Sequence, residues 1–128
     1  MKVIYIAGPF RGSNAWEIEQ NIRRAETLNL EVWRAGAVAI CPHTNTRFFQ
    51  GAAPDSVWLE GYLEVVRRCD ALIYLFNSED SSGTQTEIKA AKEYLMPIFE
   101  ALQGEKLPPE FNRWLIGDFS PREVKPFI

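Results

Sequence analysis

The chain has 128 residues and a net charge of −3, and 46% of its residues are hydrophobic and 24% are charged. These values are typical of one globular domain, which we expect to span residues 1–128, with a core in about 2–100 and a C-terminal extension in 104–128. The small negative charge gives no electrostatic basis for binding nucleic acid or an anionic membrane. No apolar run is long enough to span a membrane or to resemble a signal peptide, so we expect a cytoplasmic protein.

Metal and cofactor chemistry have little support in the composition. Cys41 and Cys69 are the only cysteines and His43 is the only histidine, so neither a disulfide framework nor a zinc-type ligand spacing is present. The glycine patterns of ATP-type and dinucleotide sites are also missing. We therefore expect free thiols in a reducing compartment, no metal and no cofactor.

Apolar runs and helical periodicity alternate along the chain. Residues 3–7 form a continuous apolar run, which is typical of a strand buried on both faces. A helix is expected from Asn14, which forms a capping-box pattern with Glu17, to the stop at Gly36. We then predict strands at 37–41, 70–76 and 96–99, a long loop at 42–56, helices at 57–69, 82–95 and 108–115, and an irregular tail at 120–128.

Short alternating strand–helix units predict an α/β fold with a parallel sheet and helices on both faces. We expect four or five strands in the order 2-1-3-4(-5). That order reverses between the first and third strands, and ligands of such sheets bind at the C-terminal strand ends beside the reversal. Two polar loops that contain glycine, residues 8–12 and 78–84, are expected to meet there.

The second of these loops is expected to open a helix at Ser82, Gly83 and Thr84, with Glu87 in the first helical turn. Such a unit points free backbone N–H groups and the positive end of the helix dipole at a ligand, which favours an anion. Arg11, from the first loop, would face that helix start and suit a phosphate or ribose hydroxyls. The alternatives are that Ser82 only caps the helix, that Glu87 faces solvent, and that Arg11 is a solvated surface residue.

Tyr5 is a polar residue at a position of the first strand that otherwise resembles core. One hypothesis is that its hydroxyl binds a backbone group. The other is that it donates to the Glu87 carboxylate, which fixes the carboxylate and keeps it ionised. A fixed carboxylate beside a sugar is what nucleophilic attack at an anomeric carbon requires.

The long connection at 42–56 contains further candidates. His43 is expected to be a hydrogen-bonding loop residue, with a catalytic base or a ligand as the alternative. Phe48 and Phe49, with Trp58 just beyond them, are expected to pack in the core or against another subunit, and the alternative is a stacking pocket for a base.

Four segments resemble, in order and approximate spacing, the nucleoside 2-deoxyribosyltransferase superfamily, above all its small bacterial and phage members. The segments are 5–12 (YIAGPFRG), 42–46 (PHTNT), 70–73 (DALI) and 81–87 (SSGTQTE), and the resemblance covers about residues 2–100. It implies a flavodoxin-like three-layer sandwich. It also implies a homo-oligomer in which a neighbouring subunit completes each site.

The resemblance assigns roles to several residues. It implies cleavage of the N-glycosidic bond of a nucleoside or nucleotide, with Glu87 as the nucleophile and Tyr5 as the residue that orients it. Ser81 and Arg11 match positions that contact the phosphate in the nucleoside 5′-monophosphate hydrolase branch.

Two departures from the family pattern concern its acids. The family has an Asp eight residues before Asp70, where this chain has Tyr62, and the transferase branch has an Asp where this chain has Ser81. Glu60, Glu79 and Asp80 are possible substitutes, each out of register. A lost general acid or base typically costs about 10²–10⁴-fold in rate.

Three functions therefore remain in view. The first is N-glycosidic cleavage or 2-deoxyribosyl transfer on a small-molecule nucleoside or its 5′-monophosphate. The second is a phosphoribohydrolase of the Gly-Thr-x-x-Glu type, although only one glycine of that motif's Gly-Gly pair is present. The third is a nucleotide-binding or sensing module without turnover. The candidate substrate-binding residues are Gly8, Pro9, Phe10, Arg11, His43, Asn45, Tyr62, Asp80, Ser81, Gly83 and Thr84.

Overall fold

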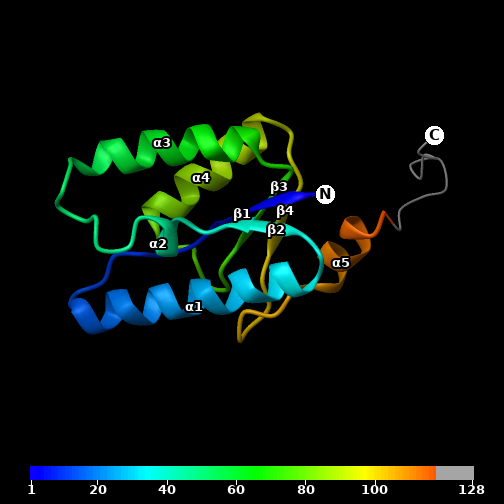
Figure 1. The fold of residues 1–128 in the computed structure, drawn as a ribbon, viewed down its shortest axis with the longest axis horizontal. Helices are drawn as coiled ribbons and strands as arrows, with labels where there is room; N and C mark the ends of the chain where they lie inside the picture. The colour runs from blue at the N-terminus through cyan, green and yellow to red at the C-terminus, as the bar shows by residue number, and fades with distance from the viewer. Residues whose placement is uncertain (118–128) are drawn as a thin grey trace.

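Four parallel strands form the centre of the structure, a computed structural model that describes residues 1–117 (Figure 1). Strand β1 (Val3–Ala7) lies between β2 (Val38–Ile40) and β3 (Ala71–Tyr74), and β4 (Ile98–Glu100) pairs with the other edge of β3. The observed order β2-β1-β3-β4 confirms the predicted α/β, flavodoxin-like topology. No fifth strand follows β4 within the described residues.

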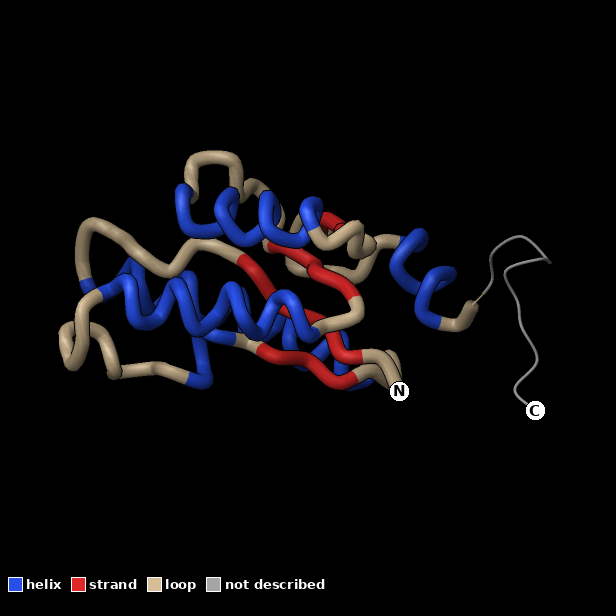
Figure 2. The backbone as a smooth tube through the Cα atoms, turned by 90° about the horizontal axis from the view of Figure 1, so that it is seen from above, coloured by secondary structure: helices blue, strands red, loops and turns tan. Residues whose placement is uncertain are grey.

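Helices cover both faces of the sheet (Figures 1 and 2). On one face lie α1 (Ala15–Arg34) and α5 (Pro109–Leu115), and on the other lie α3 (Asp55–Arg68) and α4 (Ser82–Glu93). The connection expected to be a loop contains a short helix, α2 (Pro42–Asn45), because Pro42 is well suited to a first helical position. The predicted tail at 120–128 lies outside the described residues.

Alternate side chains of β1 point to opposite faces of the sheet. Ile4 and Ile6 point into the core under α1 and α5, whereas Tyr5 and Ala7 belong to the cluster under α3 and α4. The tyrosine is fully buried, with 0% of its surface exposed. A strand that is apolar on both faces therefore has one hydroxyl, which must find a partner inside the protein.

The ends of α1 follow the capping prediction. Asn14 is the N-cap, and its side chain accepts a hydrogen bond of 2.9 Å from the backbone N–H of Glu17. The Glu17 carboxylate accepts in return from the backbone N–H of Ser13, at 2.7 Å. Gly36 follows the last turn with a φ of +95°, a conformation that only glycine adopts without strain. The two hydrogen bonds at the start of α1 fix the loop after β1 where it enters the helix.

No helix within residues 1–117 is long and apolar enough to cross a membrane.

Candidate active site

The loops that follow β1 and β3 meet at the C-terminal edge of the sheet, where α2 and the start of α3 complete a cleft of about 830 Å³. Most of the predicted site residues line this cleft. They are Gly8, Pro9, Phe10, Arg11, His43, Tyr62, Asp80, Ser81, Gly83, Thr84 and Glu87. Tyr5 and Asn45 are not part of the lining, but each donates a hydrogen bond to a residue that is.

Tyr5 and Glu87 are in direct contact at the base of the cleft. The buried Tyr5 hydroxyl donates to Glu87 Oε2, so the phenol binds a side chain rather than a backbone group. Residues on two different elements, 82 positions apart in the chain, are thus joined beside the strand-order reversal. Helix α4 begins at Ser82, as expected, but a turn has only about 3.6 residues, so Glu87 is in the second turn and not in the first. The helix dipole therefore acts on it more weakly than expected, since that effect fades beyond the first turn.

Burial controls the protonation of this pair. It raises the pKa of Glu87 to about 7, and the hydrogen bond from Tyr5 lowers that pKa only in part. Burial therefore opposes the expected ionisation of Glu87, and part of the Glu87 population is protonated near neutral pH. Burial, together with the Glu87 charge, raises the pKa of Tyr5 far above its usual range. The phenol consequently remains a hydrogen-bond donor throughout the physiological range.

The start of α4 lies against the cleft. Ser81, not Ser82, is the N-cap, and its hydroxyl accepts from the backbone N–H of Thr84 at 3.3 Å and lies 2.7 Å from Thr84 Oγ1. A side chain at Gly83 would meet no atom within 4 Å, so this glycine leaves the helix start open to a ligand. Gly8 is different, because a Cβ there would lie 2.4 Å from the Leu75 side chain. Glycine at position 8 is thus required for the β1 loop to pack on the end of β3.

Arg11 has a partner that the sequence did not indicate. Its guanidinium forms an ion pair with Asp55, the first residue of α3, and both side chains line the cleft. The carbonyls of Phe10 and Arg11 both accept from Asn21 Nδ2, at 3.2 and 3.1 Å, which holds the backbone of this loop on α1. The only hint of Asp55 in the sequence was an acidic residue directly after Pro54, a common pattern at a helix start.

Tyr62 lines the cleft and is part of a polar network. Its hydroxyl accepts from Asn45 Nδ2 at 2.9 Å and donates to Thr46 Oγ1 at 3.2 Å. Its ring meets the ring of Tyr5 edge-on, with the two centroids 6.4 Å apart. The phenol of Tyr62 therefore lies close to the Tyr5–Glu87 pair.

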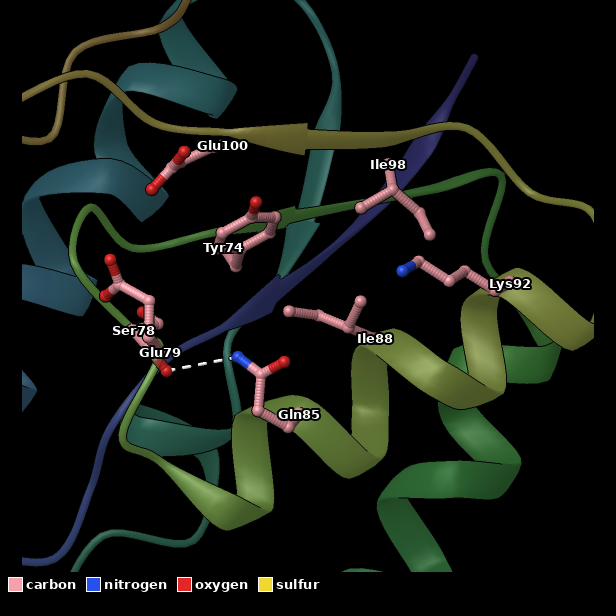
Figure 3. Close-up of a pocket in the computed structure, with 8 residues that line it drawn as sticks. All are labelled: Tyr74, Ser78, Glu79, Gln85, Ile88, Lys92, Ile98 and Glu100. Atoms are coloured by element: carbon pink, nitrogen blue, oxygen red, sulfur yellow. Dashed lines mark hydrogen bonds between the residues drawn. The ribbon is translucent and has the colours of Figure 1, made fainter.

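Of the three carboxylates considered as substitutes, only Asp80 lines the cleft. Glu79 faces a separate pocket of about 290 Å³ between α4 and the strands β3 and β4. Figure 3 shows this pocket, where the Gln85 side chain donates to the carbonyl of Ser78 at 3.2 Å and so holds the loop before α4 on the helix. Glu60 lines neither cavity.

His43 is a structural hydrogen-bonding residue. It is 5% exposed, and its Nε2–H donates to the carbonyl of Pro9 at 2.8 Å, which connects α2 to the β1 loop. Burial lowers the pKa of His43, so the imidazole is neutral at physiological pH. No group of three or more potential metal ligands occurs in the described part of the chain.

Phe48, Phe49 and Trp58, the three candidates for core packing or for a stacking pocket, differ in their surroundings. Trp58 lines the cleft and lies 5.9 Å from Phe49, measured between ring centroids. Phe48 is 84% exposed and Phe49 is 50% exposed, so neither is packed in the core of this chain.

Comparison with known proteins agrees with the fold. Residues 2–101 match the family described as "Domain of unknown function (DUF7768)". A search of curated proteins found no match. A 2-deoxyribosyltransferase from Bacillus psychrosaccharolyticus superposes with a TM-score of 0.59 and 18% sequence identity, over 91% of this chain and 80% of that one. A conserved protein from Enterococcus faecalis V583 superposes with a TM-score of 0.62 and 18% identity, over 96% and 77%. Similarity at this level of identity establishes a shared fold.

Proposed function

The chain belongs to the family described as "Domain of unknown function (DUF7768)", and from the geometry of its cleft we propose that it cleaves the N-glycosidic bond of a nucleoside or of its 5′-monophosphate. The contact between Tyr5 and Glu87 at the base of the cleft carries this proposal. The pair combines a carboxylate whose pKa is near 7 with a phenol that holds one of its oxygens. A structural neighbour that is a 2-deoxyribosyltransferase supports the same chemistry.

In the proposed reaction, Tyr5 holds Glu87 Oε2, and Oε1 attacks the anomeric carbon of the sugar. The bond from Oε1 to that carbon forms as the carbon–nitrogen bond breaks, and the bonding electron pair leaves with the base. The transition state is cationic at the sugar, and the ionised Glu87 stabilises it. Water, or a second base, then displaces Glu87. The first route is hydrolysis and the second is transfer, and both retain the configuration at the anomeric carbon.

The leaving base also needs a proton. The Tyr62 hydroxyl already donates to Thr46, so it does not replace the missing acid. We propose that the proton comes from Asp80, which lines the cleft, or from water. Water is a weak acid, and the Asp80 carboxylate must first take up a proton from solvent, so the enzyme is expected to favour bases that are good leaving groups.

Binding without turnover is the second candidate function. The specific observation that favours it is the replacement of both family acids, by Tyr62 and Ser81, whose hydroxyls are bonded within the protein. On this alternative the Tyr5–Glu87 pair only holds a sugar hydroxyl.

The experiment that separates the two is incubation with nucleosides and their 5′-monophosphates, followed by chromatography for free base. Wild-type protein should release base, and Glu87→Gln, which preserves the shape of the side chain, should not. Glu79→Gln is the matched control, since Glu79 lies in the loop before the same helix but lines the other pocket. Binding with no free base from any of these proteins would support the second function.

We also propose that the protein is a homo-oligomer, because Phe48 and Phe49 expose aromatic surface next to the cleft. Light scattering should give a mass above that of one chain. A single monomeric peak would contradict this proposal.

A further inference from the structure

The cleft contains more negative than positive charge. Its lining has one cation, Arg11, and three acidic residues, Asp55, Asp80 and Glu87, of which Glu87 is partly protonated near neutral pH. The imidazole of His43 adds no positive charge, because it is neutral at physiological pH. A ligand with a phosphate group would therefore enter a site whose field opposes it, unless the single cation is free to pair with that group.

Arg11 already has an anionic partner within the protein. The Arg11 guanidinium pairs with Asp55, and the side chains are 76% and 59% exposed, so the pair lies at the open side of the cleft and not in its floor. The two hydrogen bonds from Asn21 fix the backbone under Arg11. Asp55 is fixed in turn as the first residue of a 14-residue helix. The partners therefore come from two anchored elements, and the pair connects them across the cleft.

The helix start attracts an anion less strongly than a cation would. Ser81 accepts the backbone N–H of Thr84 with its hydroxyl and that of Gln85 with its carbonyl, which leaves the N–H groups of Ser82 and Gly83 to supply the partial positive charge. A phosphate placed there would still need a counter-ion, and it would have to compete with Asp55 for the one guanidinium.

We propose that Asp55 is a specificity-determining residue. Because its carboxylate pairs with Arg11, the guanidinium is not available to a phosphate, and the cleft binds an uncharged nucleoside more tightly than the 5′-monophosphate of that nucleoside. The choice of this ligand pair rests on the proposed function. The preference for the uncharged ligand follows from the Arg11–Asp55 ion pair and from the excess of acidic residues in the cleft lining.

The test is equilibrium binding of adenosine, 2′-deoxyadenosine and their 5′-monophosphates, measured by calorimetry. All proteins contain Glu87→Gln, so that no ligand is consumed. The parent should bind the better nucleoside more tightly than its monophosphate. Adding Asp55→Asn should move the ratio of the two affinities toward the monophosphate by about fivefold, as expected for release of an exposed ion pair together with removal of one like charge.

Two further variants isolate the ion pair. Asp80→Asn removes the same charge from the same cleft without touching Arg11, and it should move the ratio by less than about twofold. In an Arg11→Ala background, Asp55→Asn should lose most of its effect, since no guanidinium is released. The effect of Asp55→Asn should also shrink as salt is raised from about 0.05 to about 0.5 M, because an exposed pair is screened.

The proposal is overturned if the parent binds the monophosphate more tightly, if Asp55→Asn leaves the ratio unchanged, or if its effect persists without Arg11 or at high salt. Binding of neither ligand would overturn both this inference and the proposed function. Preferential binding of the nucleoside, with no base released by wild-type protein, would remove the proposed enzyme activity and leave the specificity inference standing.

Discussion

The two faces of the sheet bury different kinds of side chain, although the same strands form both. Under α1 and α5, the side chains of Ile4, Ile6 and Leu28 pack with Phe111 in a core that is almost entirely apolar. Under α3 and α4, the neighbouring side chain of the same strand is Tyr5, and it meets a carboxylate. The first face stabilises the fold, whereas the second bears a cost in stability, because it holds a buried tyrosine–carboxylate pair beside a cleft.

The size of that cost follows from protonation. An ordinary glutamate titrates near 4.5, and burial raises the pKa of Glu87 to about 7. One pKa unit corresponds to about 1.4 kcal/mol, so holding Glu87 ionised above pH 7 costs folding free energy on the order of 3–4 kcal/mol. A single carboxylate thus opposes roughly what one well-buried leucine contributes on the other face.

The largest expected effect on the cleft face is the loss of catalysis in Glu87→Gln. The amide cannot form the bond to the anomeric carbon, so kcat/KM for base release should fall by about 10³-fold or more. Initial rates of base release measure this. Activity within tenfold of wild type would mean that Glu87 is not the nucleophile.

On the opposite face, a change in packing should affect stability alone. Leu28→Ala, in α1, should lower the free energy of unfolding by about 2–5 kcal/mol, because Leu28 is 0% exposed. Leu30→Ala is the matched control on the same helix, since Leu30 is 49% exposed and should lose less than about 1 kcal/mol. Urea unfolding measures both values, and equal losses would contradict the assignment of this face.

Tyr5→Phe should sharpen the contrast between the faces, because it removes one hydroxyl and leaves the apolar ring. We expect kcat/KM at pH 7 to fall by about 10- to 100-fold, since Glu87 loses its orientation. The Tyr5 hydrogen bond lowers the pKa of Glu87, so the acidic limb of the pH profile should move to higher pH in the variant. Tyr74→Phe, on the same face but beside the other pocket, should leave that limb in place.

The smallest effect is a gain in stability from Glu87→Gln. The folded-state pKa of Glu87 is above its unfolded value, so wild-type protein has the full contribution of the protonated carboxyl below about pH 4.5 and loses it as pH rises through 7. The amide avoids this loss. The variant should match wild type at pH 5 to within about 1 kcal/mol and exceed it by about 1–3 kcal/mol at pH 8, measured by urea unfolding. If the difference in free energy of unfolding between the variant and wild type became smaller as pH rises, ionisation of Glu87 would not be destabilising the folded protein.

Sequence patterns predicted most of the architecture, because hydrophobic periodicity and turn residues are local signals. The apolar run at 3–7 and the Asn14–Glu17 cap both appear as expected in the structure. The order of the strands followed from general rules of chain connection, and those rules brought the two glycine-containing loops together.

The finer features of the site depended on contacts that sequence spacing does not contain. Ser81 caps α4 in place of Ser82, and Glu87 lies in the second helical turn and not in the first. The pairing of Arg11 with Asp55 joins residues 44 positions apart, and neither residue type indicates the other. The protonation of Glu87 depends on how much protein covers it, which only the folded arrangement specifies.

The most direct test of the Tyr5–Glu87 pair is a search for the covalent intermediate. Wild-type protein is mixed with a nucleoside that it cleaves, quenched in acid after one turnover, and analysed by intact and peptide mass spectrometry. A chain heavier by one sugar less water, with the added mass on the peptide that contains Glu87 and absent in Glu87→Gln, is the predicted result. Release of base with no sugar attached to Glu87 would contradict a nucleophilic role for this residue.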